Sequence, residues 1–148
     1  MTDDIKALCD AALSNPAFKP NNGVTHCNEA VNQVAVAVGC SEFVGLMADE
    51  IYQTILTNAS GKWAKVDGSD AAIWSLSNGL AIAGLPSQRL GEAHGHVAVV
   101  APFGMLGSES LGLDVPVVCN VGKTVGYMKS SQAFPVSCGE ADYFTYAG

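Results

Sequence analysis

The sequence contains few charged residues and very few basic ones. Only 14% of its 148 residues are charged, and 7 Lys and Arg stand against 14 Asp and Glu, which gives a net charge of −7 at pH 7. Proteins that bind nucleic acid neutralise phosphates with Lys and Arg, and anionic membrane surfaces attract clusters of basic residues. We therefore expect a domain that binds neither nucleic acid nor an anionic membrane surface.

Long apolar runs and a basic leader are also missing. No run approaches the roughly 20 apolar residues that cross a bilayer, so we expect no membrane insertion. Residues 1–6, MTDDIK, are acidic and polar, whereas a signal peptide begins with basic residues followed by an apolar stretch. No signal peptide is visible, and three locations stay open: the cytoplasm, export by another route, or export with a leader that has been removed.

The cysteines form no metal-binding or redox motif. The chain has 5 of them and no C-x-x-C pair, which argues against a zinc ribbon or a thioredoxin-type site. Cys9 and Cys138 lie near opposite ends of the chain, and the ends of compact domains are often close together. A disulfide between them would imply an oxidising place of action; the alternative is that both are small buried apolar residues.

The pattern of apolar residues predicts one α+β domain over residues 1–148. Hydrophobic residues make up 49% of the chain, enough for a substantial core. Helices are expected first and strands later, which is typical of helices packed on an antiparallel sheet. The expected helices cover 4–13, 27–38, 46–57 and a short segment capped by Asp70, and the expected strands cover 80–85, 96–101, 115–121 and 142–146. Residues 122–134 fit either a strand or a loop, and Trp63 lies in a loop or a short strand.

Cys27 begins the clearest of these helices. An apolar stripe with helical spacing follows it, formed by Ala30, Val31, Val34, Ala35 and Val38. Thr25 is a candidate N-cap, and Gly39 is a typical residue after a helix end. Because a helix N-terminus carries partial positive charge, we expect a lowered pKa for the Cys27 thiol. The competing interpretations are a valine-rich strand and an inert buried cysteine.

His96 follows a glycine at the start of an apolar strand, where a histidine faces a cleft. An imidazole there can act as base and then as acid for a cysteine nucleophile. His94 lies two residues earlier, and this H-x-H spacing, completed by Cys27 and His26, is also a metal-chelating pattern. No recognised ligand framework accompanies it, so we expect no metal and no cofactor. His26, Asn28 and His94 are the candidate substrate-binding residues.

A third polar group often orients the imidazole of such a pair. Asn120 and Cys119 lie on the next strand, and because neighbouring strand residues point to opposite faces only one of them can do this. Asp114, where that strand begins, is a further candidate. The oxyanion hole would use the backbone N–H of Cys27 and a side chain from Asn21, Asn22 or His26.

At these residues the chain resembles the papain-like cell-wall amidases, the superfamily of NlpC-type peptidases and CHAP amidases. It is most similar to the first family of type VI secretion amidase effectors. The matching stretches are residues 27–31, CNEAV, 79–85, GLAIAGL, and 95–100, GHVAVV, with a weaker match over 117–120 and 126–130. The resemblance covers roughly residues 20 to 135, and Asn28-Glu29-Ala30 replaces the commoner Ser-(Gly or aliphatic)-(aromatic) after the cysteine.

The resemblance implies a papain-like domain in which Cys27 attacks an amide of the peptidoglycan stem peptide and His96 moves the proton. The implied bond joins γ-D-glutamate to diaminopimelate. It also implies delivery by a secretion machine to the periplasm of a rival bacterium and an immunity protein there as partner. A bridge between Cys9 and Cys138 would fit that location.

Three other functions stay open. The first is a thiol hydrolase of the same fold that acts on another amide or on a γ-glutamyl peptide. The second is a non-catalytic binding or immunity-type domain with a structural cysteine. The third is a small metallohydrolase that uses His94 and His96.

Overall fold

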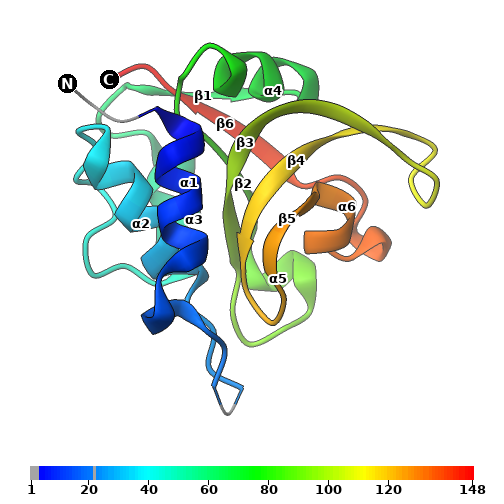
Figure 1. Cartoon of the computed structure of the whole chain (residues 1–148), viewed down its shortest axis with the longest axis horizontal. Helices are drawn as coiled ribbons and strands as arrows, with labels where there is room; N and C mark the ends of the chain where they lie inside the picture. The colour runs from blue at the N-terminus through cyan, green and yellow to red at the C-terminus, as the bar shows by residue number, and fades with distance from the viewer. Residues whose placement is uncertain (1–3, 22) are drawn as a thin grey trace.

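One antiparallel sheet of six strands organises the chain (Figure 1). The structure is a computed structural model and describes residues 4–21 and 23–148. The strand order is β1-β6-β2-β3-β4-β5, and every neighbouring pair is antiparallel. The strands are β1 (Trp63–Val66), β2 (Ala81–Leu85), β3 (His96–Ser108), β4 (Leu113–Val121), β5 (Val125–Lys129) and β6 (Asp142–Tyr146).

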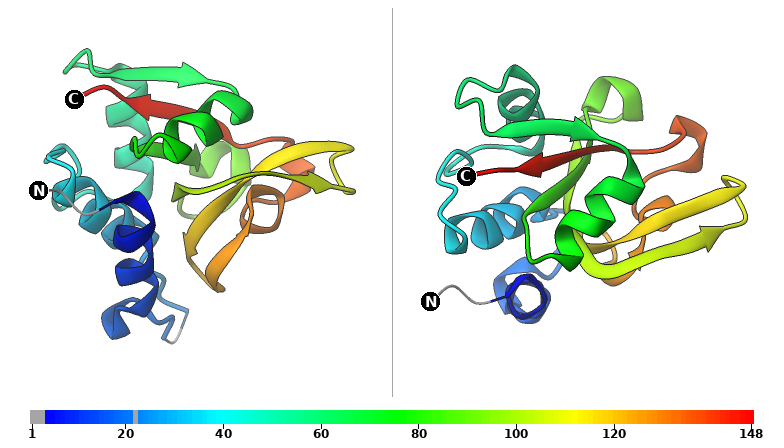
Figure 2. Two further views of the ribbon diagram at one scale, coloured as in Figure 1. Left: turned by 45° about the horizontal axis from the view of Figure 1, so that its top comes forward. Right: turned by 90° about the horizontal axis from the view of Figure 1, so that it is seen from above.

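The helices cover both faces of this sheet. They are α1 (Ile5–Ser14), α2 (Cys27–Ala37), α3 (Ala48–Thr57), α4 (Gly68–Leu76), α5 (Ser87–Leu90) and α6 (Ser130–Ala133), with 3₁₀ turns η1 (Pro16–Phe18) and η2 (Val136–Cys138). Figures 1 and 2 show α1, α2 and α3 together on one side of the sheet and α6 on the other. The expected α+β class is confirmed.

Two apolar cores result, one on each face, because strand side chains alternate between faces. On β3, Val97 and Val99 belong to the core beneath α1, α2 and α3. Ala98 and Val100 belong to the opposite core, which contains Phe134. We call these the helical face and the α6 face of the sheet. The alternation decides which site residues share a face.

Strand β3 extends beyond its expected end. The sequence predicts a strand over 96–101 that ends before Pro102, yet β3 runs to Ser108. The pairing of β3 with β4 shifts register between Val100 and Met105, and Pro102 lies within that irregularity. A bulge is one of the few places where a strand tolerates proline, because the missing N–H breaks no ladder hydrogen bond there.

Two helix caps differ from the sequence-based expectation. The side chain of Asp67, not Asp70, accepts the N–H of Asp70 and caps α4. His26, not Thr25, is the N-cap residue of α2, and its side chain makes no capping hydrogen bond. The undecided stretch 122–134 forms β5 and α6.

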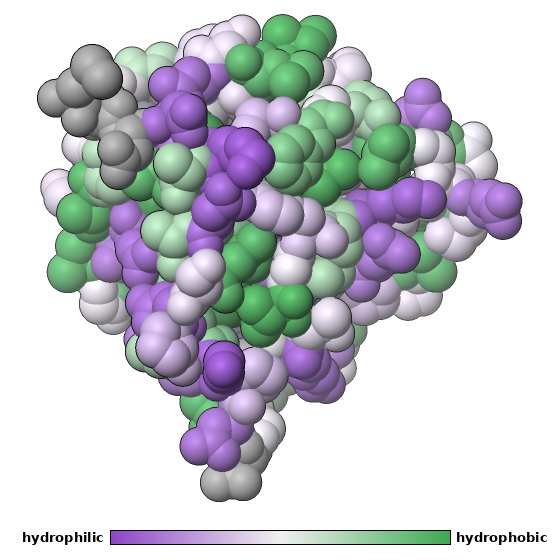
Figure 3. Space-filling view, in the orientation of Figure 1, coloured by the Kyte–Doolittle hydropathy of each residue, from purple (hydrophilic) through white to green (hydrophobic). Residues whose placement is uncertain are grey.

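Helix α4 presents large apolar side chains to solvent. Its inner side is made of small residues, since Ala71 and Ala72 are buried against the sheet, whereas Ile73, Trp74 and Leu76 are exposed. Figure 3 shows apolar surface at the top edge of the molecule, over α4. Among the described residues no helix is long and apolar enough to span a membrane.

Of the two alternatives for Cys9 and Cys138, the bridge is absent in the described residues, where both cysteines are free. Cys9 is buried on the helical face, whereas Cys138 packs at the α6 face with its Sγ 3.3 Å from the carbonyl oxygen of Arg89. The sheet separates the two thiols, so nearness of the chain ends does not bring them together. The acidic start considered at residues 1–3 lies outside the described residues.

Candidate active site

Cys27 is the first residue of α2 and faces the start of β3. The stripe that includes Ala30, Val31 and Val34 is buried on the helical face, and it turns the Cys27 side chain toward the sheet. Cys27 is only 6% exposed, and the backbone N–H groups of Val97, Asn28 and Cys27 itself favour its thiolate. The sulfur therefore lies near the backbone of the residue that follows His96.

Burial raises the pKa of the Cys27 thiol above its ordinary value, and this outweighs the backbone N–H groups that favour the thiolate. The expectation of a lowered pKa from the helix N-terminus is therefore wrong for the chain without substrate. Desolvation dominates because the sulfur is almost fully covered. Cys27 is a neutral thiol at neutral pH in this state.

His96 and Asn120 form a close side-chain pair on adjacent strands. Nε2 of His96 lies 2.6 Å from Oδ1 of Asn120. The imidazole also packs on the ring of Phe134, with ring centroids 4.9 Å apart, and is half-buried. These contacts fix the ring on the α6 face at the start of β3.

The hydrogen bonds around Asn120 determine the tautomer of His96. The amide Nδ2 of Asn120 donates to the carbonyl oxygen of Thr124 at 2.8 Å, so its Oδ1 faces the imidazole as an acceptor. Nε2 of a neutral His96 must then carry the proton and donate it to Oδ1. Nδ1 holds a free lone pair, which is the state that a general base requires.

Burial also lowers the pKa of His96, although the hydrogen bond to Asn120 and the charge of Glu92 act in the opposite direction. The imidazole is therefore neutral at neutral pH. Both His96 and Cys27 are therefore uncharged, and the chain holds no preformed thiolate–imidazolium pair.

Two glycines leave room for the ring and for the loop that leads to it. A Cβ on Gly122 would lie 3.2 Å from Cε1 of His96 and 3.5 Å from Nδ2 of Asn120. A Cβ on Gly95 would lie 2.7 Å from Oδ1 of Asp49 and 3.0 Å from the carbonyl oxygen of Leu85. The Gly-His motif thus reflects close backbone packing before the imidazole.

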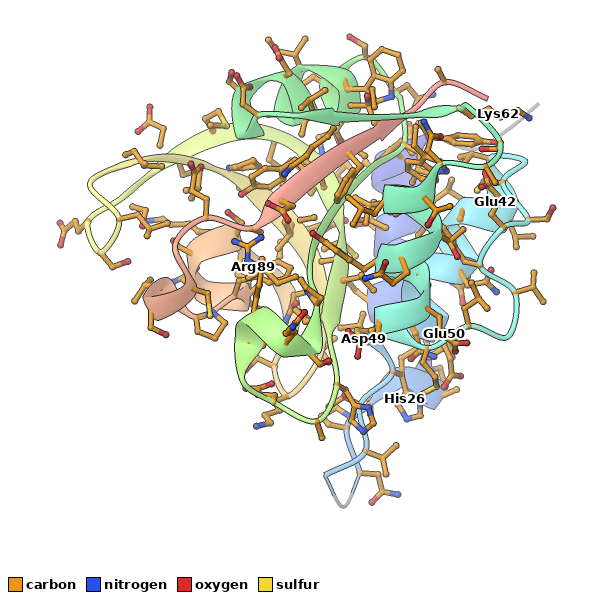
Figure 4. The ribbon with its side chains drawn as sticks, turned by 180° about the vertical axis from the view of Figure 1, so that it is seen from behind. His26, Glu42, Asp49, Glu50, Lys62 and Arg89 are labelled. Carbon is orange, nitrogen blue, oxygen red and sulfur yellow. The ribbon has the colours of Figure 1, made fainter. Side chains whose placement is uncertain are left out.

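Helix α3 holds the segment that delivers His96. Oδ1 of Asp49 accepts the N–H of Ser87 at 2.7 Å. The hydroxyl of Tyr52 donates to Oδ2 of Asp142 at 2.6 Å, and Arg89 donates to the same oxygen at 2.7 Å. Figure 4 shows Asp49 on α3 and Arg89 on α5, on either side of the strand that leads into this segment. The segment 86–95 is therefore tied to α3 and to β6.

Alternation along β4 decides between the candidate orienting residues. Cys119 points to the helical face, where its Sγ lies 3.7 Å from the carbonyl oxygen of Cys9. Asp114 lies six residues before Asn120, which is roughly 20 Å along a strand, and it pairs with Gly107 in the β3–β4 hairpin. Asn120 is the residue that orients His96.

A cavity of about 570 Å³ opens beside the His96–Asn120 pair. Lys123 is the cationic side chain among its lining residues, and Glu92 is the carboxylate. The lining consists of Gly23, Thr25, Leu90, Glu92, Ala93, His94, Gly95, His96, Asn120, Gly122, Lys123, Thr124, Gln132, Ala133 and Pro135. His94 is therefore at the cavity, as expected for a substrate-binding residue. Cys27 does not line it, although Gly23 and Thr25 of the preceding loop do.

The structure does not bring His26 and Asn28 to this cavity. Nδ1 of His26 lies 2.8 Å from Oε1 of Glu29, and its ring stacks on Phe18. Figure 4 shows His26 at the same end of the molecule as Asp49 and Glu50. Asn28 donates to the carbonyl oxygen of Leu46 at 3.0 Å and lines a separate cavity of about 330 Å³.

The structure separates the candidate donors of the oxyanion hole. The backbone of Asn21 pairs with that of Val24 in an isolated bridge, and Asn22 lies outside the described residues. Nδ1 of His26 is engaged with Glu29. The backbone N–H of Cys27, the first of the helix, is the remaining candidate donor.

Cys27 and His96 approach the start of β3 from its two faces. The thiol lies with Val97 in the core of the helical face, while the imidazole packs on Phe134 at the α6 face. Within residues 4–21 and 23–148 no hydrogen bond joins the thiol to the ring, and Nδ1 of His96 has no hydrogen-bond partner. The described residues contain no group of three or more His, Cys, Asp or Glu side chains that could hold a metal ion.

Several residues of this site carry little or no signal in the sequence. Phe134, Thr124, Gly122 and Lys123 contact the imidazole, fix Asn120 or line the cavity, and Asp49 supports the loop. The turn Gly-Lys-Thr directly after Asn120-Val121 was the one available signal, because a turn at the end of β4 must face the start of β3. Nothing in the sequence marks Phe134 or Asp49.

No family model matches the chain, and no curated protein matches it.

Proposed function

We propose that this protein is a cysteine amidase. The observation that carries the proposal is the His96–Asn120 pair, in which the amide of Asn120 leaves Nδ1 of His96 as a free base at the strand end that Cys27 contacts. A nucleophile at a helix start, a base on a strand and an orienting amide are the three parts of cysteine hydrolase chemistry.

The reaction begins from the neutral pair. The side chains of Cys27 and His96 lie on opposite faces at the start of β3 and must come together as the substrate carbonyl binds. The thiol proton of Cys27 then moves to Nδ1 of His96 and the sulfur bonds to the carbonyl carbon. The backbone N–H of Cys27 at the start of α2 stabilises the oxyanion. The imidazolium then gives its proton to the leaving amine as the C–N bond breaks, which produces a thioester.

Hydrolysis of the thioester completes the cycle. His96, again neutral, removes a proton from water, and the hydroxide oxygen bonds to the acyl carbon. The C–S bond breaks, and the proton on His96 returns to the sulfur. Throughout both halves, Asn120 accepts the Nε2–H of His96, which keeps the ring oriented while Nδ1 gains and loses its proton.

The proposed substrate is the peptide stem of bacterial peptidoglycan, cleaved between γ-D-glutamate and diaminopimelate. This choice rests on the resemblance of the motifs around Cys27 and His96 to the cell-wall amidases. Lys123 at the cavity supports it, because both residues flanking that bond carry free carboxylates that a lysine can pair with. On this proposal the enzyme acts in the periplasm of a rival cell after delivery by a secretion system, and an immunity protein inhibits it there.

Digestion of purified sacculi tests the proposal. We expect the wild-type chain to release stem-peptide fragments and Cys27→Ala and His96→Ala to release none. Cys40→Ala is the matched control, because Cys40 is a buried cysteine of the same core that lies away from the cavity. Activity that survives Cys27→Ala would overturn the mechanism. Cleavage of protein or γ-glutamyl peptides but not of sacculi would keep the chemistry and change the substrate.

A non-catalytic binding domain is the second candidate. It is favoured by the burial and raised pKa of Cys27 and by the absence of this residue from the cavity lining. In that case the wild-type chain would bind sacculi or a protein partner without cleaving either, and Cys27→Ala would leave the binding unchanged.

A further inference from the structure

Cys9 and Cys119 face each other across the packing of α1 on β4. Sγ of Cys119 lies 3.7 Å from the carbonyl oxygen of Cys9. The two residues are 0% and 4% exposed and belong to the same apolar core. Contact with the Cys9 side chain and burial both raise the pKa of Cys119. The pair has no part in the proposed chemistry, which uses Cys27, His96 and Asn120.

A second contact holds α1 in place over this pair. Tyr127 of β5 is the register partner of Cys119. Its hydroxyl donates to the carboxylate of Asp10, the residue next to Cys9, and lies 3.4 Å from the carbonyl oxygen of Lys6. The helix turn that carries Cys9 is therefore fixed against the strand that carries Cys119 by groups other than the thiols. Because disulfide geometry is specific, contacts that hold α1 against β4 without the thiols favour pairing of these two cysteines.

We propose that Cys9 and Cys119 form a disulfide when the chain folds in an oxidising compartment. The oxidant is a disulfide, either glutathione disulfide or the active-site disulfide of a thiol oxidoreductase. One cysteine thiolate attacks a sulfur of the oxidant's disulfide, forms a mixed disulfide and releases one thiol of the oxidant. The other cysteine thiolate then attacks the mixed disulfide at the first cysteine's sulfur and releases the oxidant's second thiol. Both electrons reduce the oxidant, and the two protons of the cysteines end on its two thiols.

Burial sets the time at which this bond forms. An oxidant cannot reach either sulfur once α1 is packed on the sheet, so the exchange takes place during folding, before the helix docks. For the same reason a reductant cannot reach the finished bond. Cys9 and Cys119 are 110 positions apart, so the bond closes most of the chain into one loop and restricts the unfolded state.

Refolding of the full chain tests the proposal without reference to any activity. The denatured, reduced protein is refolded in a mixture of reduced and oxidised glutathione, then denatured, alkylated and digested without reduction. We expect mass spectrometry to find the peptides of Cys9 and Cys119 joined, two hydrogens lighter than their sum, and Cys27, Cys40 and Cys138 alkylated. Alkylated or glutathionylated Cys9 and Cys119, or Cys9 joined to another cysteine, would overturn the proposal.

Thermal unfolding supplies the second measurement. The oxidised wild-type chain should unfold at a higher temperature than the same chain reduced under denaturing conditions and refolded. This difference in unfolding temperature should vanish in Cys9→Ala. It should persist in Cys40→Ala, the control, because Cys40 is a buried cysteine of the same core. Equal unfolding temperatures for a wild-type chain shown to carry the bond would contradict the expected restriction of the unfolded state. The comparison within the wild-type chain needs no variant to fold.

Discussion

Nε2 of His96 donates a hydrogen bond to Oδ1 of Asn120 at 2.6 Å, and the amide of Asn120 is itself fixed by the carbonyl of Thr124. This chain of two hydrogen bonds gives His96 a defined tautomer before any substrate binds. It leaves Nδ1 as the basic nitrogen, although the thiol of Cys27 and the imidazole are both neutral. The imidazole of His96 is therefore oriented in advance, but neither His96 nor Cys27 carries a charge in advance.

Replacing Asn120 tests that orientation. In Asn120→Ala the imidazole loses its acceptor and can adopt the other tautomer, so we expect kcat on stem-peptide fragments to fall by about 100-fold, within the usual range for a general base. Asn120→Asp keeps an acceptor and adds a negative charge, which raises the pKa of His96. Its acid limb in the pH–rate profile should move to higher pH. An unchanged profile in Asn120→Asp would show that His96 is not the group that titrates.

The reactivity of Cys27 tests the neutral state of the pair. Because burial raises the pKa of Cys27, iodoacetamide should modify this residue slowly at neutral pH, and the rate should rise only above the ordinary thiol value of 9.0. A Cys138→Ser background removes the most accessible of the other thiols. Rapid labelling of Cys27 near neutral pH, followed by peptide mapping, would mean that a thiolate–imidazolium pair exists before substrate binds.

The lowered pKa of His96 makes stability depend on pH. As the pH falls below the ordinary value of 6.5, the unfolded chain takes up a proton that the folded chain does not bind. The folding contribution is complete above 6.5 and declines as the pH falls toward the lower folded pKa. Urea midpoints measured on both sides of this window should differ more for the wild-type chain than for His96→Gln. Equal differences would assign the acid sensitivity to other groups.

Much of the fold follows from local patterns in the sequence, and the site follows only in part. The stripe of α2 predicts that Cys27 faces the sheet, and alternation predicts that Asn120 and Cys119 point to opposite faces. The register of β3 against β4 decides whether Asn120 or Cys119 lies on the same side of the sheet as His96. In this register Val99 pairs with Cys119. Register between strands is a long-range property that no local pattern contains.

The same limit explains why the expected pKa of Cys27 is wrong and why the possible Cys9–Cys138 bridge does not form. The helix N-terminus at Cys27 predicts a lowered pKa, but the depth of burial that reverses this comes from the packing of α2 on β3. Positions near the chain ends suggest a Cys9–Cys138 pair, but the sheet lies between these residues. In both cases the local argument is sound and a tertiary contact outweighs it.

The attachment of α3 to β6 should contribute measurably to stability. Burial and the hydrogen bond that the Tyr52 hydroxyl donates to Asp142 raise the pKa of Tyr52 to about 12. Tyr52→Phe removes one hydrogen bond to a charged group but leaves Arg89 on the same carboxylate. We expect the free energy of unfolding to fall by about 1–2 kcal/mol, measured by urea denaturation. Tyr127→Phe removes a comparable hydrogen bond, from Tyr127 to the carboxylate of Asp10. It tests whether losing any tyrosine–carboxylate hydrogen bond lowers the free energy of unfolding by the same amount.

Tyr52→Phe should also affect the site, because Asp142 holds Arg89 and thereby the segment 86–95 that leads to His96. We expect kcat to fall in Tyr52→Phe and to stay unchanged in Tyr127→Phe when both are assayed well below their unfolding temperatures. Equal kcat values would limit the role of this contact to stability.

On the proposed function, Lys123 should select substrates that carry a carboxylate beside the scissile amide. It is the cation at the cavity of a chain whose net charge is −7, so its loss leaves Glu92 to repel an acidic substrate. In Lys123→Gln we expect KM for an acidic stem-peptide fragment to rise about twofold to fivefold, as for an exposed ion pair, with kcat unchanged. Lys129→Gln is the matched control, because Lys129 lies outside this cavity. Amidation of the substrate carboxylate should cost the wild-type enzyme the same factor and should cost Lys123→Gln nothing more. If amidation lowers the efficiency of both enzymes equally, another group binds the carboxylate.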